Sequence, residues 1–137
     1  MRSRWSILIV DDELGVRESL RILLKPYYEI YTASDGEAAL NIIKERKIHL
    51  ITLDLNMPKL SGIETLREIR KIDGEVPVII ITGYGTQKDA EEALLYGVKD
   101  FIAKPFNTST IITVINQILG DGIEQNRGEF KKEPSKR

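Results

Sequence analysis

Residues 5–13 read Trp-Ser-Ile-Leu-Ile-Val-Asp-Asp-Glu, a short apolar run that ends abruptly in three acidic residues. The run from Trp5 to Val10 contains several β-branched residues, which favours a β-strand. Its residues are nearly all apolar instead of alternating with polar ones, a pattern typical of strands buried on both faces. The stretch therefore predicts an interior strand that brings carboxylates to one end of a sheet.

Four more strand candidates follow, and amphipathic stretches with helical periodicity separate them. We expect strands at 5–10, 28–32, 48–53, 77–81 and 100–103, and helices at 14–25, 37–46, 63–71, 86–96 and 108–119. Strands that alternate with helices form right-handed crossovers between parallel strands. The fold class predicted is therefore α/β, with a five-stranded parallel sheet and helices on both of its faces.

Length and composition narrow the function further. The 137 residues suit one domain, which we expect over 1–119, followed by a charged and flexible linker or tail over 120–137. The chain has no Cys and one His, which excludes disulfides, thiol catalysis and multi-His metal centres. A net charge of −1 gives no reason to expect binding to nucleic acid or to anionic membranes. We expect a cytoplasmic protein without a membrane span.

Polar or charged residues follow four of the five predicted strands. In an open parallel sheet, ligands bind beyond the carboxyl ends of the strands. Each residue alone also has an ordinary interpretation as a helix cap, turn or surface residue, but their joint occurrence favours a site. The set consists of Asp11, Asp12 and Glu13 after the first strand, Asp54 after the third, Thr82 and Gly83 after the fourth, and Lys104 and Pro105 after the fifth.

The acidic members of this set predict a magnesium site. Two carboxylates ~4 Å apart repel each other by about 4 kcal/mol at an effective dielectric constant of 20, so Asp11, Asp12 and Asp54 need a cation if they meet. Mg²⁺ suits them because it binds a few carboxylates, keeps water ligands and accepts a phosphoryl oxygen. Lys104 could pair with a carboxylate or a phosphate, and the Thr82 hydroxyl could bind an oxyanion.

The order and spacing of these residues resemble the receiver domain of two-component response regulators. The resemblance covers residues 5–119 and implies a doubly wound, flavodoxin-like sheet with strand order 2-1-3-4-5. It rests on four motifs: Asp11-Asp12; Leu53-Asp54-Leu55-Asn56-Met57-Pro58 with Gly62; Thr82-Gly83; and Lys104-Pro105-Phe106. Residues 81–85 and 100–106 are most similar to receivers joined to transcriptional effectors.

The resemblance implies a role for each of the three aspartates and for Asn56. Asp54 resembles the phosphoacceptor, which takes a phosphoryl group from the phosphohistidine of a sensor histidine kinase. Asp12 resembles a direct Mg²⁺ ligand and Asp11 one that acts mainly through water. Asn56 resembles the residue whose backbone carbonyl completes the metal site. Such a protein is a phosphorelay switch that assists its own phosphorylation and dephosphorylation, and is not an enzyme in the ordinary sense.

The resemblance also implies how phosphorylation reaches an output. Thr82 and Lys104 match the hydroxyl and the lysine that contact the phosphoryl group. Phe101 occupies the position of an aromatic switch residue that is most often Tyr, so a role needing the Tyr hydroxyl is not expected. Phosphorylation adds about two negative charges. The expected result is a homodimer, or docking of an effector domain or downstream protein, through the last two helices and fifth strand. The chain lacks a basic helix-turn-helix region, which argues against direct nucleic-acid binding.

Three alternative functions compete with that of a phosphorylated receiver. A phosphatase with an aspartyl-phosphate intermediate usually has a second Asp two residues after the first, where this chain has Asn56. A nucleotide- or flavin-binding module needs a phosphate-binding loop after the first strand, where Asp11-Asp12-Glu13 would repel phosphate. The remaining alternative is a receiver-like interaction module that works without phosphorylation. The single imidazole, His49, lies at the start of the third strand, far from the strand ends, and is expected to be structural.

Overall fold

A computed structural model describes residues 4–83 and 85–120 of the chain. Within them, strands and helices alternate strictly, as the sequence predicted. The order is β1 (Ser6–Val10), α1 (Leu14–Leu24), β2 (Glu29–Ala33), α2 (Gly36–Glu45), β3 (Leu50–Leu53), α3 (Gly62–Ile72), β4 (Val78–Thr82), α4 (Gln87–Leu95), β5 (Asp100–Ala103) and α5 (Thr108–Leu119). Several boundaries shift by one or two residues from the predicted ones, and β3 starts at Leu50 instead of Ile48.

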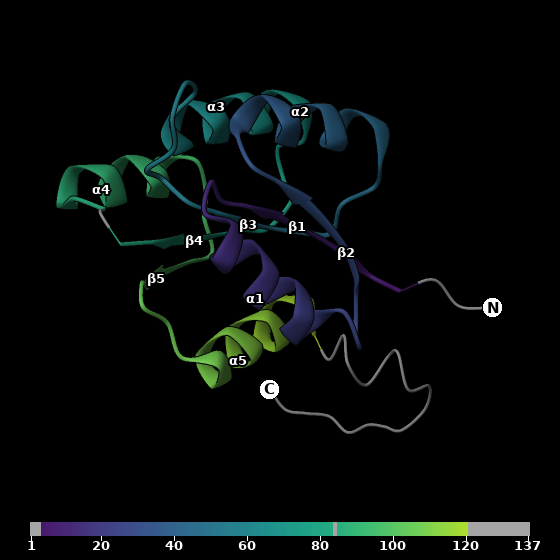
Figure 1. The fold of residues 1–137 in the computed structure, drawn as a ribbon. Helices are drawn as coiled ribbons and strands as arrows, with labels where there is room; N and C mark the ends of the chain where they lie inside the picture. Colours follow the sequence, from purple (N-terminus) through teal and green to yellow (C-terminus); the bar gives the residue numbers. More distant parts are fainter. Residues whose placement is uncertain (1–3, 84, 121–137) are drawn as a thin grey trace.

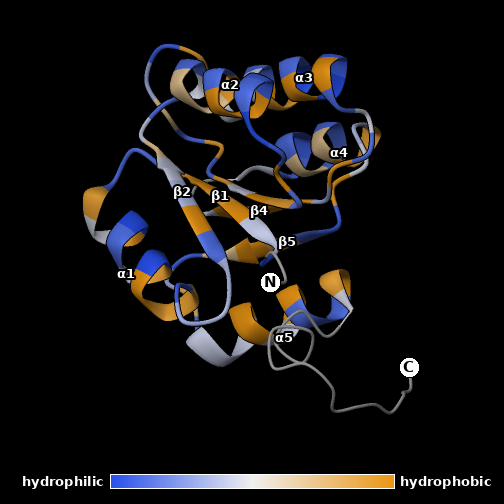
Figure 2. Ribbon diagram, turned by 90° about the vertical axis from the view of Figure 1, so that its right-hand side faces the viewer, coloured by the Kyte–Doolittle hydropathy of each residue, from blue (hydrophilic) through white to orange (hydrophobic). Residues whose placement is uncertain are grey.

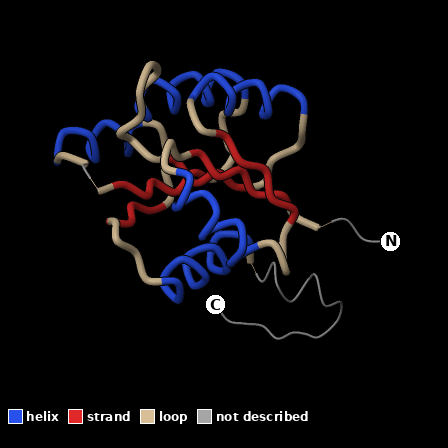
Figure 3. Tube along the Cα trace, in the orientation of Figure 1, coloured by secondary structure: helices blue, strands red, loops and turns tan. Residues whose placement is uncertain are grey.

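The five strands form one sheet in the order β2-β1-β3-β4-β5, and every pairing is parallel. This confirms the predicted doubly wound topology. Helices α1 and α5 cover one face, while α2, α3 and α4 lie on the other (Figures 1 and 3). The strand order reverses direction at β1. The connection after the carboxyl end of β1 therefore leads to one face of the sheet, and the connection after the carboxyl end of β3 leads to the other. Such a reversal leaves a crevice at that edge of the sheet.

Side chains of the inner strands divide between two cores, one on each face of the sheet. In β1, Leu8 and Val10 pack under α2 and α3, whereas Ile7 and Ile9 pack against α1 and α5. The same alternation continues in β4, because successive side chains of a strand point to opposite faces. Figure 2 shows the inner strands largely in orange, while each helix carries both orange and blue. Burial on both faces explains why these strands lack a polar alternation.

Local signals in the sequence fix where the helices start and stop. The Asp35 carboxylate accepts a hydrogen bond from the Ala38 N–H at 2.8 Å, which starts α2. Ser61 and Glu64 form a capping box at α3. Gly97, with φ of 75°, follows the end of α4, in a conformation that glycine adopts without strain.

The single domain expected over 1–119 stays a prediction. The charged tail expected over 120–137 lies, beyond Gly120, outside the described residues. None of the helices within 4–83 and 85–120 has the length and apolar character needed to cross a membrane.

Candidate functional site

The acidic segment after β1 is held in place by its own backbone. Asp11 continues the sheet, because its N–H donates to the Ala33 carbonyl at 3.1 Å. The Glu13 N–H donates to Asp11 Oδ1 at 2.9 Å, and the Arg17 guanidinium donates to the Asp11 carbonyl at 2.9 Å. The Asp11 side chain is therefore fixed and buried, whereas Asp12 is exposed at the same strand end.

Asp54 follows β3 in the same way. Its N–H donates to the Val10 carbonyl at 3.0 Å, which places it beside Asp11. Its carboxylate is only 4% exposed and accepts a hydrogen bond from the Asn56 N–H at 3.3 Å. Gly62 packs directly under this turn, since an added Cβ would lie 2.4 Å from the Asp54 carbonyl oxygen and 2.3 Å from Leu55 Cα. Only glycine lets α3 approach Asp54 so closely.

The three aspartates meet as the sequence predicted. One carboxylate oxygen each from Asp11, Asp12 and Asp54 lies within 4.8 Å of the others. Burial raises the pKa of Asp11 above its usual value, although hydrogen bonds from Lys104 and Glu13 act in the opposite direction. An all-oxygen set of two buried carboxylates and one exposed carboxylate fits a hard divalent cation such as Mg²⁺.

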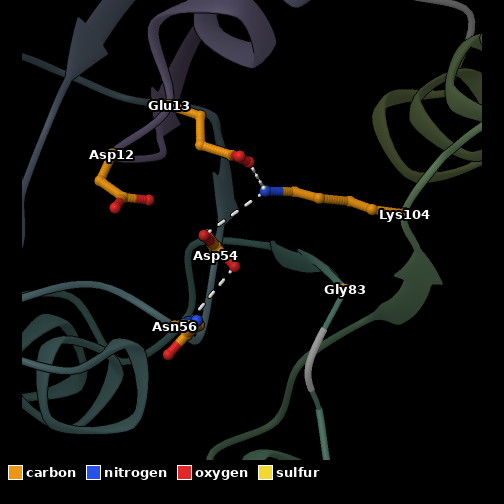
Figure 4. Close-up of a pocket in the computed structure, with 6 residues that line it drawn as sticks. All are labelled: Asp12, Glu13, Asp54, Asn56, Gly83 and Lys104. Carbon is orange, nitrogen blue, oxygen red and sulfur yellow. Dashed lines mark hydrogen bonds and ion pairs between the residues drawn. The ribbon is translucent and has the colours of Figure 1, made fainter.

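Lys104 reaches this cluster from the opposite side of the crevice. Its Nζ lies 2.8 Å from Asp11 Oδ2. It also lies 2.9 Å from Glu13 Oε1 and 3.4 Å from Asp54 Oδ2 (Figure 4). Burial alone would lower the pKa of Lys104, but the hydrogen bonds to Asp11 and Glu13 outweigh it and raise that pKa above its usual value. The ammonium therefore remains charged and offsets part of the carboxylate repulsion.

The backbone around Lys104 places this residue directly after β5 at the edge of the sheet. The Lys104 N–H donates to the Thr82 carbonyl at 3.1 Å, which extends the β4–β5 pairing by one residue. The peptide bond between Lys104 and Pro105 is cis, an arrangement found almost only before proline. The Lys104 side chain extends from this position to the carboxylates that follow β1 and β3.

These side chains line a cleft of about 390 Å³ at the carboxyl ends of the strands. Its walls are Asp12, Glu13, Asp54, Asn56, Gly83 and Lys104 (Figure 4). The cleft is open to solvent, and the Asp54 carboxylate lies close to both the acidic pair and the ammonium. Chemically, the cleft can hold a divalent cation and present a carboxylate oxygen to an incoming electrophile. The Lys104 ammonium beside that carboxylate can attract anionic oxygens.

Thr82 and Phe101 lie behind this cleft, on adjacent strands. Thr82 is buried at the end of β4, where it pairs with Ala103, while the Phe101 ring is half-buried. The loop after β4 runs close over both side chains. A Cβ added to Gly85 would lie 2.9 Å from the Phe101 ring and 3.1 Å from Thr82 Cγ2. A movement of Gly85 would therefore change the packing of both side chains.

The sequence predicted the role of His49 better than that of Glu13. Glu13 belongs to the predicted strand-end set but received no role, and its ion pair with Lys104 emerges only from the fold. The signal available was its position directly after the two aspartates. His49 lies away from the cleft, at the start of β3, where its Nδ1 accepts a hydrogen bond from the Ser6 N–H at 3.0 Å. This contact confirms the structural interpretation of His49.

Comparison with known proteins gives a consistent result. The sequence profile of the response regulator receiver domain matches residues 7–116. A chemotaxis protein CheY of Thermotoga maritima is 38% identical over 114 residues, which cover 82% of this chain and 95% of that protein. A probable transcriptional regulator ycf27 of Guillardia theta is 38% identical over 120 residues, covering 87% of this chain. These cover 47% of ycf27, so the chain spans about half the length of that relative.

The fold is also found in solved structures. A chain of the CheX–CheY–BeF₃–Mg²⁺ complex of Borrelia burgdorferi superimposes with a TM-score of 0.80 and 30% sequence identity. The match covers 85% of this chain and 90% of that one.

Proposed function

Because this chain belongs to the response regulator receiver domain family, we propose that Asp54 is the residue on which it carries the phosphoryl group of a phosphorelay switch. The observation that carries the proposal is the position of the Asp54 carboxylate, which is buried at the floor of the cleft, close both to the aspartates after β1 and to the Lys104 ammonium. Phosphoryl transfer depends on positioning and charge neutralisation more than on covalent machinery.

Each of the chain's own residues has a task in the transfer. A bond forms between phosphorus and an Asp54 carboxylate oxygen while the bond from phosphorus to the donor breaks, and the leaving group keeps the electron pair. The Lys104 ammonium neutralises oxygens of the transferred group. The Asn56 N–H holds Asp54 Oδ1 at 3.3 Å, which leaves Oδ2 directed toward Lys104. The same residues would assist the later hydrolysis, in which a water oxygen bonds to phosphorus and the Asp54 carboxylate leaves.

Asp11, Asp12 and Asp54, with the backbone carbonyl of Asn56, are proposed to hold Mg²⁺. When bound, this ion supplies Lewis-acid neutralisation of the phosphoryl oxygens. Support comes from the donor chemistry of the cluster, which consists of carboxylate oxygens within 4.8 Å of one another. The exposed Asp12 is the carboxylate with the least competition from Lys104, since no ion pair joins these two residues among those described.

Thr82 and Phe101 are proposed to convert phosphorylation into a structural change. A phosphoryl group brings about two negative charges and acceptor oxygens to the cleft, which a hydroxyl at the end of β4 can approach. Because the loop at Gly85 touches both side chains, such a movement would alter the start of α4. Leu94 and Leu95 of α4 are 65% and 84% exposed, which supports docking through α4, β5 and α5.

A receiver domain implies two kinds of partner, a histidine kinase upstream and an effector downstream. We propose that the effector, or a second copy of this chain, docks on the α4–β5–α5 face. A cytoplasmic location follows for this proposal, because ATP-dependent kinases are supplied with their nucleotide there. Direct nucleic-acid binding by this chain is not part of the proposal.

The test is intact mass after incubation with acetyl phosphate, in Mg²⁺ and in chelator. We expect one phosphoryl adduct that requires Mg²⁺ and disappears in Asp54→Asn. Asp100→Asn is the matched control, because Asp100 is an exposed aspartate at the opposite end of the sheet and should leave the adduct unchanged. An adduct that persists in Asp54→Asn would refute the site. No adduct in the wild type, with metal binding confirmed, would favour an interaction module that works without phosphorylation.

A further inference from the structure

All three protons of the Lys104 ammonium are already engaged. An ammonium has three N–H donors and no acceptor. Three carboxylate oxygens lie around Nζ, at 2.8 Å in Asp11, 2.9 Å in Glu13 and 3.4 Å in Asp54. The side chain of Lys104 is 15% exposed, so water has little room to compete. Before the bond to Asp54 forms, an oxygen of the incoming phosphoryl group can therefore gain a bond from this ammonium only if one carboxylate gives up its own.

Glu13 differs from the other two partners in burial. Its side chain is 61% exposed, whereas those of Asp11 and Asp54 are 3% and 4% exposed. A carboxylate released into water regains its hydration, but one left alone in the protein interior does not. While all three carboxylates are ionised, before transfer, Glu13 is thus the partner that Lys104 can lose at the lowest cost.

The position of Glu13 also shows that its side chain serves the cleft and not its own helix. It is the N-cap residue of α1, yet its side chain makes no capping hydrogen bond. The residue instead spans the crevice to a lysine 91 positions away in the sequence (Figure 4). Meanwhile its N–H fixes the Asp11 carboxylate at 2.9 Å. The backbone of Glu13 orients one partner of Lys104, and its side chain is another.

We propose that Glu13 is a positioning residue that holds Lys104 at the mouth of the cleft before phosphorylation and releases it when phosphoryl oxygens arrive at Asp54. The inference rests on the proposed function of Asp54. It adds that release of Glu13 precedes or accompanies phosphoryl uptake, so the Glu13–Lys104 ion pair slows that step. Once the phosphoryl group is bound, Glu13 no longer contacts the ammonium, and its side chain has no effect on loss of the group.

Two substitutions separate this role from a general effect of charge. Glu13→Gln removes the charge and keeps the shape, while Glu13→Asp keeps the charge but is one methylene too short to reach Lys104. Both should speed phosphoryl uptake from acetyl phosphate at saturating Mg²⁺ by about two- to five-fold, the range for releasing one half-exposed ion pair. Both should leave the rate of phosphoryl loss unchanged. Glu75→Gln is the matched control, an exposed glutamate at the opposite end of the sheet.

A second readout does not depend on phosphorylation. The ¹⁵N resonance of the Lys104 ammonium, assigned by its absence in Lys104→Arg, should shift in both Glu13 variants without Mg²⁺, and remain in place in Glu75→Gln. Three results would overturn the inference: an unshifted resonance, an acceleration in Glu13→Gln but not in Glu13→Asp, or equal changes in uptake and loss. Failure of the wild type to accept a phosphoryl group would refute the proposed function instead, and the resonance would still decide whether Glu13 holds Lys104.

Discussion

Replacing Lys104 with Met would leave two buried carboxylates without the cation that lies between them. Met keeps most of the length and apolar surface of the lysine side chain, so the change removes mainly the charge. The Lys104 ammonium is 2.8 Å from Asp11 and 3.4 Å from Asp54, and both carboxylates are almost fully buried. Without metal, we expect Lys104→Met to be less stable than the wild type, and we expect Mg²⁺ to restore much of the lost stability.

The distances set the size of the effect. At an effective dielectric constant of 20, the attraction of the ammonium to each of these carboxylates is about 5–6 kcal/mol. Burying the charges costs several kcal/mol per ion, which offsets much of that attraction. Breaking a buried pair from one side typically destabilises a protein by about 3–5 kcal/mol, because the remaining charge is uncompensated. The free energy of unfolding at pH 7 should fall by this amount in chelator.

Urea unfolding with and without Mg²⁺ measures the effect. A cation bound at 100 times its dissociation constant adds about 2.7 kcal/mol to the wild type, and should add more to Lys104→Met, where it also replaces the missing charge. Acid should act in the same direction as the metal. Burial already raises the pKa of Asp11, and loss of the Lys104 hydrogen bond raises it further. A carboxyl whose folded pKa is above its unfolded pKa binds protons more readily when folded, so the variant's deficit should shrink as pH falls from 7 toward 5.

Lys71→Met is the matched control. Lys71 makes an exposed ion pair with Glu68 at 3.0 Å on α3, and its loss should cost no more than about 0.5 kcal/mol. The reasoning would be refuted if Lys104→Met were no less stable than Lys71→Met in chelator. It would also be refuted if Mg²⁺ stabilised both variants equally.

Two further predictions follow from contacts outside the charged cluster. Gly62→Ala should lower the free energy of unfolding by about 1–3 kcal/mol and slow phosphorylation, because its Cβ would meet the Asp54–Leu55 backbone. Gly15→Ala is the control, since its Cβ would meet nothing within 4 Å and should stabilise α1. Equal effects of the two in urea unfolding would contradict this explanation. Burial, with a smaller effect from Lys47, lowers the pKa of His49 below its unfolded value. Its contribution to stability is therefore present above the unfolded pKa of about 6.5 and lost as pH falls toward the folded one. Wild type should lose more stability than His49→Gln between pH 7.5 and 5, and parallel pH profiles would contradict the assignment.

Much of the fold could be predicted because the buried strands appear in the sequence as short apolar runs. The apolar runs ending at Val10, Leu53 and Ile81 fit strands buried on both faces, and the strands they form, β1, β3 and β4, are buried along their whole length. Boundaries were less certain. Ile48 is apolar and buried, as a strand residue would be, but it precedes β3 because the ladder with β1 begins only at Ile7 and Leu50. Hydropathy reports burial, whereas a strand is defined by its hydrogen bonds.

The candidate site divides in the same way. The strand-end rule brought Asp11, Asp54 and Lys104 together from the sequence, because parallel strands end at one edge. The rule says nothing of which side chains touch. Glu13 shows the limit: the sequence indicates an acidic residue at a helix start, where capping is the common use. Its actual partner is a lysine 91 residues later, which the pairing of β5 with β4 brings within reach.

By itself, the sequence determined the alternation of strands and helices, the parallel sheet and the edge at which chemistry would lie. These depend on local periodicity and on composition, which any stretch of the chain carries within itself. Only the tertiary structure decided that one ammonium is shared by three carboxylates, and that Gly62 must approach the Asp54 backbone. Ion pairs and close packing depend on distances of a few ångströms between elements far apart in the chain, and packing of the whole sheet and its helices sets those distances.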